Sequence, residues 1–94
     1  MAEDLVWLDG ELVPLAEARV SVVDRSFTVG DGVFESLKAV DGRPFALGRH
    51  LARLHRSAER VGLAVGWTDD ELRGAVDAVL TARPRPLARV RITV

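Results

Sequence analysis

The pattern of hydrophobic and polar residues predicts a β-hairpin near the start of the chain. Residues 5–8 (LVWL) and 11–14 (ELVP) are short, apolar-rich runs separated by Asp9 and Gly10. An Asp-Gly pair between two such runs is a strong hairpin signal, because both residues tolerate the positive φ that the turn needs. The β-branched run at 18–23 that follows predicts either a third strand or an extended connection.

A second hairpin of the same design is predicted over residues 33–47. Residues 33–40 are an extended candidate, and Asp41-Gly42 turns the chain into 43–47 (RPFAL). Side chains alternate along a strand, which places Glu35, Leu37 and Ala39 on one face and Phe34, Ser36, Lys38 and Val40 on the other. Neither face is cleanly apolar. Two explanations fit such a strand. It often borders a cleft or a subunit interface, but a solvated edge strand is the commoner explanation.

The apolar spacing changes to three and four after residue 49, which predicts two helices. The first covers 49–61, where the apolar side is formed by Leu51, Leu54, Ala58 and Val61, and Gly62 ends it. The second begins at Thr68, which forms a capping box with Glu71 and is followed at helical spacing by Leu72, Val76, Val79 and Leu80. Residues 87–94 (LARVRITV) alternate again and predict a final strand.

These elements predict one small α+β domain over residues 1–94, with a mostly antiparallel sheet and two helices on one face. A chain of 94 residues with 48% hydrophobic content is long enough for one core. Because no turn or polar tail follows the strand pattern at 87–94, we expect the chain to be the front part of a longer protein. The rival expectation is a stand-alone, non-catalytic domain that dimerises or binds a small ligand. The sheet of such an independent domain should be complete.

Composition argues against several classes of protein. The net charge is -1, from 13 basic and 14 acidic residues, so no overall field draws the chain to nucleic acid or to an anionic membrane. The sequence contains no cysteine, so disulfides and thiolate metal sites are excluded. No apolar segment approaches the roughly 20 residues that cross a bilayer, and residues 1–10 lack a basic, apolar leader pattern. We therefore expect a cytoplasmic protein with no membrane partner.

Arginine recurs along the first predicted helix, opposite Leu51 and Leu54, at positions 49, 53, 56 and 60. Such a stripe can bind phosphate or nucleic acid, because a guanidinium group pairs with phosphate through two hydrogen bonds. Glu59 interrupts the stripe and no aromatic residue is interleaved, so a solvated face is the commoner explanation and we expect no nucleic-acid partner. His50 and His55 fall on different sides of the helix without a carboxylate cluster, which argues against a metal site.

The stretch 29–35 (VGDGVFE) is either a turn between two elements or one wall of an active site. Gly30 and Gly32 permit positive φ and a close approach of backbone to a ligand. No third glycine stands at dinucleotide spacing and no P-loop lysine follows, so a phosphate loop is not indicated. From these residues alone, a plain turn is the commoner explanation.

Two motifs, taken together, resemble the N-terminal part of the class IV aminotransferases. They are residues 24–35 (DRSFTVGDGVFE) and 50–58 (HLARLHRSA). This family comprises the fold-type IV pyridoxal-phosphate enzymes, which include D-amino-acid and branched-chain aminotransferases and aminodeoxychorismate lyase. The resemblance covers nearly the whole chain, from the first hairpin through Arg91, and the two motifs at this separation are specific where either alone would be weak.

The resemblance implies roles for four residues. Arg53, in the family's His-x-x-Arg-Leu segment, is expected to bind the cofactor phosphate. Phe34, with Val29 ahead of it, is expected to line the substrate pocket, and Arg91 lies where branched-chain relatives carry a pocket arginine. Branched-chain enzymes commonly have tyrosine at the place of Val29 and glycine at the place of Ser36, so both departures favour the D-amino-acid aminotransferase or lyase branch.

The resemblance also implies that decisive residues lie elsewhere. Catalysis in this family needs a lysine that binds pyridoxal phosphate, and the family places it well beyond position 94. Lys38, the only lysine of the sequence, matches no catalytic position. We therefore expect the whole protein to be a homodimeric, pyridoxal-phosphate-dependent aminotransferase or lyase of amino acids or aminodeoxychorismate, and residues 1–94 alone to be inactive.

Overall fold

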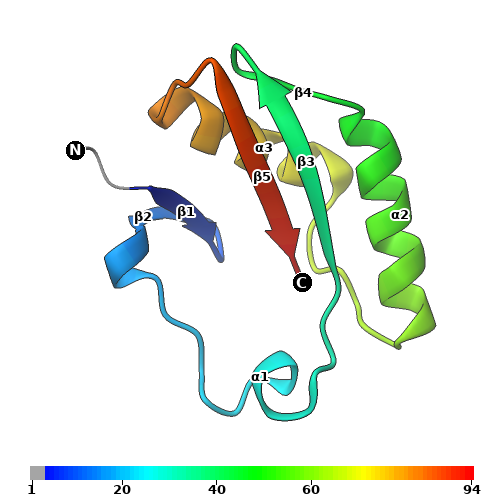
Figure 1. The fold of residues 1–94 in the computed structure, drawn as a ribbon. Helices are drawn as coiled ribbons and strands as arrows, with labels where there is room; N and C mark the ends of the chain where they lie inside the picture. Colours follow the sequence, from blue (N-terminus) through cyan, green and yellow to red (C-terminus); the bar gives the residue numbers. More distant parts are fainter. Residues whose placement is uncertain (1–3) are drawn as a thin grey trace.

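The structure is a computed structural model that describes residues 4–94. Its strands are β1 (Leu5–Leu8), β2 (Glu11–Pro14), β3 (Phe34–Val40), β4 (Arg43–Pro44) and β5 (Leu87–Thr93). Its helices are α1 (Arg25–Val29), α2 (Leu47–Arg60) and α3 (Asp69–Ala82), with a 3-10 turn at Leu15–Glu17. Figure 1 shows α2 running beside β3 while α3 lies behind β3 and β5.

The strands of residues 4–94 form two antiparallel sheets. β1 pairs with β2, and β3 is the central strand of the second sheet, between β4 and β5. β3 pairs with β5 along its whole length, from Phe34 opposite Thr93 to Val40 opposite Leu87. The α+β class with antiparallel pairing is therefore confirmed. β4 pairs only with Ala39 and Val40, so the explanation of β3 as an edge strand fails at that end, while the rest of the strand is paired with β5 alone.

Both predicted Asp-Gly turns are present. Asp9 and Gly10 have φ of 50° and 95°, and Asp41 and Gly42 have φ of 51° and 78°. Positive φ at both central residues is the geometry of a two-residue hairpin turn, whose twist matches that of the flanking strands. The two hairpins therefore share one design, as their shared dipeptide predicts.

The second hairpin is shorter than the predicted 43–47. β4 has only two residues, Arg43 and Pro44, and proline has no backbone N–H with which to extend the pairing. Ala46 then turns with φ of 54°, and α2 begins at Leu47, two residues before the predicted start. Residues expected in a strand thus lead directly into the helix.

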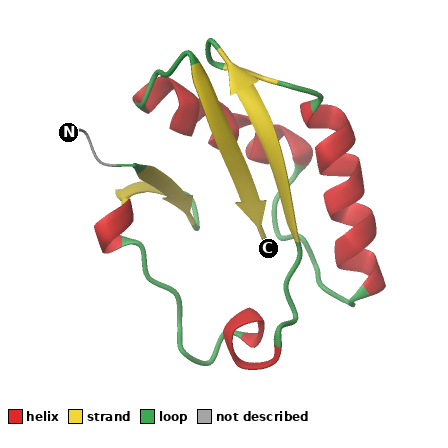
Figure 2. Ribbon diagram, viewed as in Figure 1, coloured by secondary structure: helices red, strands yellow, loops and turns green. Residues whose placement is uncertain are grey.

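The connection from β2 to β3 contains α1, a short helix that the apolar pattern did not predict (Figure 2). Asp24 caps its start by accepting a hydrogen bond from the backbone N–H of Ser26 at 2.8 Å. Gly30, with φ of 75°, ends it in the left-handed conformation. Residues 18–23 form no strand; residues 18–21 connect to a turn at 22–23, where the backbone N–H of Asp24 donates to the Ser21 carbonyl at 3.1 Å.

One hydrophobic core lies between the second sheet and the two long helices. Leu51 and Leu54 of α2 have no exposed surface. They pack in one cluster with Leu37, Ala39, Leu47, Leu72, Val76, Leu80 and Val90, which come from β3, β5, α2 and α3. Two helices on one face of the sheet are therefore confirmed. No helix among residues 4–94 has the length and apolar character needed to span a bilayer.

The second long helix begins as its sequence predicts. The Thr68 hydroxyl accepts from the backbone N–H of Glu71 at 3.1 Å, and the Glu71 carboxylate accepts from the backbone N–H of Thr68 at 3.0 Å. This reciprocal pair satisfies two backbone donors that a helix start otherwise leaves without partners. The capping box therefore fixes where α3 begins and how the chain enters the core.

Candidate functional site

Glu35 is the one charged side chain within residues 4–94 that is buried, with 6% of its surface exposed. It lies on the inner face of β3 together with Leu37 and Ala39, where β3 packs against α2. A carboxylate removed from water is costly unless cations and hydrogen-bond donors replace its hydration. The position of Glu35 therefore requires partners from the helix above it.

Two side chains of α2 supply those partners. Arg53 Nε lies 3.0 Å from both oxygens of the Glu35 carboxylate, and Arg53 Nη2 donates to Oε1 at 2.8 Å. His50 Nδ1 lies 2.8 Å from the same Oε1. Residues three apart lie on the same side of a helix, so one side of α2 presents both groups to one carboxylate.

These contacts change the proton affinities of the pair. The hydrogen bond from Arg53 lowers the pKa of Glu35 below its ordinary value of 4.5; burial opposes this change, and the hydrogen bond with His50 adds to it. The same hydrogen bond with Glu35 raises the pKa of the Arg53 guanidinium. The ionised forms of both residues are therefore the stable ones at neutral pH.

Arg53 keeps part of its hydrogen-bonding capacity free. A guanidinium group carries five N–H donors in one plane, and Glu35 occupies the edge formed by Nε and Nη2. Nη1 has no hydrogen-bond partner in residues 4–94, and the side chain is 60% exposed. The second edge, formed by Nη1 and Nη2, is therefore accessible, and its geometry suits the bidentate binding of a phosphate group.

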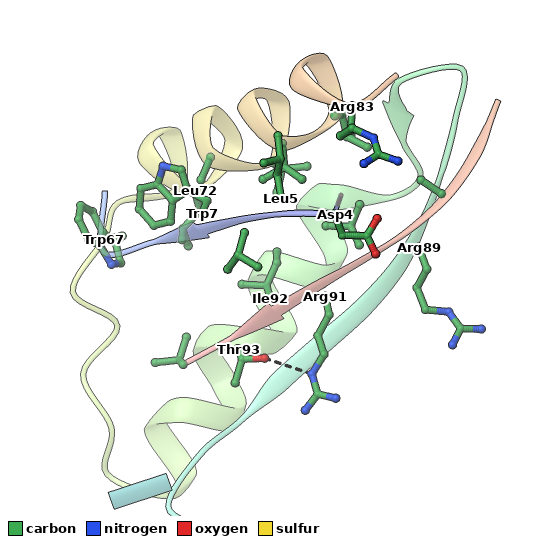
Figure 3. Close-up of a pocket in the computed structure, with 18 of the residues that line it drawn as sticks. Asp4, Leu5, Trp7, Trp67, Leu72, Arg83, Arg89, Arg91, Ile92 and Thr93 are labelled. Atoms are coloured by element: carbon green, nitrogen blue, oxygen red, sulfur yellow. Dashed lines mark hydrogen bonds between the residues drawn. The ribbon is translucent and has the colours of Figure 1, made fainter. Parts of the chain in front are cut away.

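A second group of residues lies on the outer face of the same sheet. The guanidinium carbon of Arg91 lies 4.0 Å from the centre of the Phe34 ring, within the range of a cation–π interaction. Arg91 Nε also donates to Thr93 Oγ1 at 3.1 Å, the bond drawn as a dashed line in Figure 3. Thr93 is paired with Phe34 across the two strands, so the three side chains share one face.

A groove lies on the other side of β5, between β1, β5 and α3. Its volume is about 570 Å³, and Trp7, Trp67, Leu72 and Ile92 are among the residues that line it. The two indole rings meet edge to face, with centroids 4.9 Å apart and planes at 72°. Arg91 and Thr93 also line this groove, so the groove adjoins the Phe34 face, although Figure 3 shows Arg91 projecting from β5 away from the indoles.

The stretch 29–35 ends one helix and leads into β3. Its two glycines, Gly30 and Gly32, are needed for different reasons. Gly30 has positive φ, whereas a Cβ added at Gly32 would collide with Ser26 Oγ, so that position needs a small residue for packing. The Arg25 guanidinium binds the Asp31 carboxylate and holds the turn against α1. Val29, the last residue of α1, is exposed.

Of the four residues expected at the site, the structure brings two together. Phe34 and Arg91 are in contact on the outer face. Within residues 4–94, no hydrogen bond, ion pair or ring contact joins Val29 or Arg53 to that pair. Arg53 instead binds Glu35, on the opposite face of β3.

Glu35 and His50 were not predicted from the sequence as members of the site. The alternation along 33–40 places Glu35 only on a mixed polar and apolar strand face, and His50 is interpreted as an unsupported metal ligand and as the first residue of the motif 50–58. A signal was present, because Glu35 shares its face with the apolar Leu37 and Ala39 and is therefore expected to be buried. A buried carboxylate needs a cation, and the neighbouring helix offers arginines at 49, 53, 56 and 60.

The fold is shared with solved class IV amino-transferases. The family described as amino-transferase class IV matches residues 32–94, which is more than half of the chain and includes β3, both long helices and β5. The chain therefore belongs to the amino-transferase class IV family. The fold-type IV expectation drawn from the two motifs is confirmed.

Individual relatives agree with this assignment. The D-alanine aminotransferase of Staphylococcus epidermidis is 42% identical over 67 residues, which are 71% of this chain and 24% of that protein. The branched-chain aminotransferase of Thermoproteus uzoniensis, crystallised with norvaline, superposes with a TM-score of 0.88 at 37% identity, covering 98% of this chain and 33% of that one. The branched-chain amino acid aminotransferase of Escherichia coli gives a TM-score of 0.87 at 29% identity, covering 98% of this chain and 32% of that one.

One further relative was solved with a phosphorylated ligand. It is a branched-chain amino acid aminotransferase complexed with N-(5'-phosphopyridoxyl)-L-glutamate. Its TM-score is 0.88 at 26% identity, with 99% of this chain and 33% of that one covered. This relative is therefore similar to the chain in fold over almost every residue.

The chain is much shorter than these relatives. It spans about a quarter of the length of the curated relatives that it matches. Relatives from the D-alanine and the branched-chain branches have similar identities, so identity alone does not choose between the branches.

Proposed function

We propose that the chain is the N-terminal part of a pyridoxal-phosphate-dependent class IV aminotransferase, or of the related lyase, acting on an amino acid or aminodeoxychorismate. The family match over 32–94 supports this proposal, as does the similarity to an enzyme complexed with a phosphopyridoxyl amino acid. The observation that carries it is Arg53, an exposed guanidinium held on one edge by Glu35 and open on the other. A non-catalytic, stand-alone domain is less well supported, because the relatives are aminotransferases.

The residues of this chain fit such a cofactor. Pyridoxal phosphate, when bound, supplies an electron sink for chemistry at the carbon that carries the substrate amine. The open edge of Arg53 binds the phosphate through paired charge-assisted hydrogen bonds and so anchors the cofactor. Phe34 and Arg91 offer a ring and a cation side by side, which suit the apolar and carboxylate parts of an amino-acid-like substrate, and Val29 shapes the rim of the pocket.

The first experiment asks where the cofactor binds covalently. Purified protein is incubated with pyridoxal phosphate, reduced with borohydride so that any bond to a lysine becomes permanent, and weighed intact by mass spectrometry. We expect one reduced cofactor on the whole protein and no stoichiometric adduct on the 94-residue, 10.2 kDa chain. A whole protein without adduct would contradict the proposed function, and an adduct on Lys38 would contradict the expectation that the catalytic lysine lies elsewhere.

The second experiment tests Arg53 as the phosphate anchor. The dissociation constants of pyridoxal phosphate and of pyridoxal, which lacks the phosphate, are measured on the whole protein. The ratio of the pyridoxal to the pyridoxal-phosphate constant isolates the contribution of the phosphate. We expect Arg53→Gln to reduce this ratio at least tenfold, since a charge-assisted pair of hydrogen bonds is lost. Arg56→Gln, which removes an exposed arginine of the same helix, is the matched control and should leave the ratio unchanged.

We also propose that the whole protein is a homodimer, as the family resemblance implies. The connection between β2 and β3 supports this, because Val22, Val23 and Phe27 are each at least 70% exposed. Apolar side chains gathered in one segment are typical of surfaces that another chain covers. Sedimentation equilibrium should give the mass of two chains, and Val22→Glu with Val23→Glu should shift it toward that of one.

A further inference from the structure

We propose that Glu35 and His50 are positioning residues that fix the guanidinium of Arg53 before a phosphate group binds to it. This inference rests on the proposed function of Arg53 and concerns how its free edge is held in place. Arg53 is a long side chain with most of its surface exposed, and such a side chain is normally mobile. The hydrogen bonds between Arg53 and Glu35 remove that freedom.

The hydrogen bonds to Glu35 determine the plane of the guanidinium group. Nε and Nη2 of Arg53 both donate to one carboxylate, at 2.8 to 3.0 Å. Two parallel donors on one edge of a planar group allow little rotation about the side chain. With that edge fixed, the edge formed by Nη1 and Nη2 points away from Glu35 in a single direction and is ready for a bidentate partner.

Glu35 is itself held firmly enough to serve as an anchor. It belongs to β3, where it is paired with Ile92 of β5, and its side chain is buried beside the core. His50 gives the carboxylate oxygen Oε1 a second partner, and the His50 side chain is only 18% exposed. A carboxylate bound from two positions of α2 cannot follow Arg53 if the arginine moves, so Arg53 is the member that becomes ordered.

The alternative is that Glu35 competes with phosphate for Arg53. The carboxylate is an anion and partly neutralises the guanidinium charge, which weakens its attraction for a second anion. The two possibilities predict opposite changes in phosphate-dependent affinity when the Glu35 carboxylate is removed. Loss of the carboxylate lowers the phosphate-dependent affinity if Glu35 positions Arg53, and raises it if Glu35 competes.

The decisive measurement is the ratio of the pyridoxal to the pyridoxal-phosphate dissociation constant on the whole protein carrying Glu35→Gln. Without the carboxylate, the Arg53 side chain must be ordered when the phosphate binds, and this ordering costs affinity. We therefore expect the ratio to fall about two- to tenfold. A merely structural role would weaken both ligands alike and leave the ratio unchanged. Asp69→Asn is the matched control, because it removes the other histidine–carboxylate contact of α2, between His55 and Asp69 at 2.6 Å.

A second measurement needs no variant. In protein free of phosphate and cofactor, NMR hydrogen exchange at the Nε–H of Arg53 should be slower than at that of the exposed Arg56, because Glu35 already accepts the Arg53 hydrogen. Equal exchange rates would overturn the inference even if Glu35→Gln fails to fold. An unchanged or increased ratio in Glu35→Gln would also overturn it. If Arg53→Gln keeps the wild-type ratio, it is the phosphate-binding role of Arg53 that fails.

Discussion

The two faces of β3 are made of alternate residues of one strand, yet they hold their charged groups in different ways. On the inner face, Glu35 is buried between apolar neighbours and its charge is bound by Arg53 and His50. On the outer face, Phe34 is 55% exposed and Arg91 lies over its ring. The inner charge is held by hydrogen bonds from Arg53 and a contact with His50, whereas the outer face leaves its groups in contact with water.

This difference matches the two tasks that we propose for the two faces. A side chain that must keep another residue in place needs rigid surroundings, which the core gives to Glu35. Side chains that contact a bound molecule must be accessible, as Phe34 and Arg91 are. In the proposal, β3 carries Glu35 as the positioning residue on one face and Phe34, which forms the contact surface with Arg91 of β5, on the other, because successive side chains point to opposite faces.

Shortening a side chain should cost more stability on the inner face than on the outer face. Leu37→Ala removes a side chain that is 5% exposed and leaves a cavity beside α2, so we expect the free energy of unfolding to fall by about 2–5 kcal/mol. Val40→Ala, at a position that is 45% exposed, is the matched control, and we expect a change of about 0.5 kcal/mol or less. Urea denaturation measures both. Equal losses would show that the outer face is also packed.

Most of the fold could be predicted from local chemistry. Both Asp-Gly turns and the capping box at Thr68 are set by a few adjacent residues, and the two long helices follow from apolar spacing. The predictions were less accurate where neighbouring elements decide the outcome. Pro44 shortens the second hairpin, and α2 begins two residues early at Leu47. The helix α1 was missed because it is too short to show a period, although Asp24 and Gly30 mark its ends.

The site was less predictable than the fold, because its contacts join residues that are far apart in the sequence. Glu35 and Arg53 are 18 positions apart, and only the packing of α2 on β3 brings them together. The arginine stripe alone gave no reason to prefer Arg53 to Arg56; the preference came from the family resemblance. The roles of Arg53, Phe34, Val29 and Arg91 toward cofactor and substrate stay predictions.

The inner face should also respond to pH in a way that the outer face does not. The pKa of Glu35 is lower in the folded protein than its ordinary value of 4.5, so the unfolded chain binds more protons in acid. The stability that Glu35 contributes is therefore complete above about pH 4.5 and is lost as pH falls through the lowered pKa. We expect Glu35→Gln to be less stable than wild type at pH 7 and the difference to shrink in acid.

Urea denaturation at several pH values, from neutral into the acid range where carboxylates titrate, tests this prediction. Only the difference between wild type and Glu35→Gln is interpreted, since other carboxylates titrate in both proteins. Glu59→Gln, which removes one exposed carboxylate from α2, is the matched control for the loss of a charge. A difference between wild type and Glu35→Gln that stays constant over this range would mean that the contacts with Arg53 and His50 do not favour the ionised carboxylate in solution.

The smallest expected effect concerns the outer face. A double-mutant cycle with Phe34→Leu and Arg91→Gln measures their coupling in the free energy of unfolding, and we expect about 0.5–1 kcal/mol, the range for an exposed cation–π pair. Phe34→Leu with Arg89→Gln is the matched cycle, since Arg89 lies on the same face of β5 but pairs with Lys38 in the register and should give no coupling. If the Phe34–Arg91 coupling is absent as well, the two side chains move independently in solution. The outer face would then offer a substrate two separate contacts, and the contrast with the ordered inner face would become sharper.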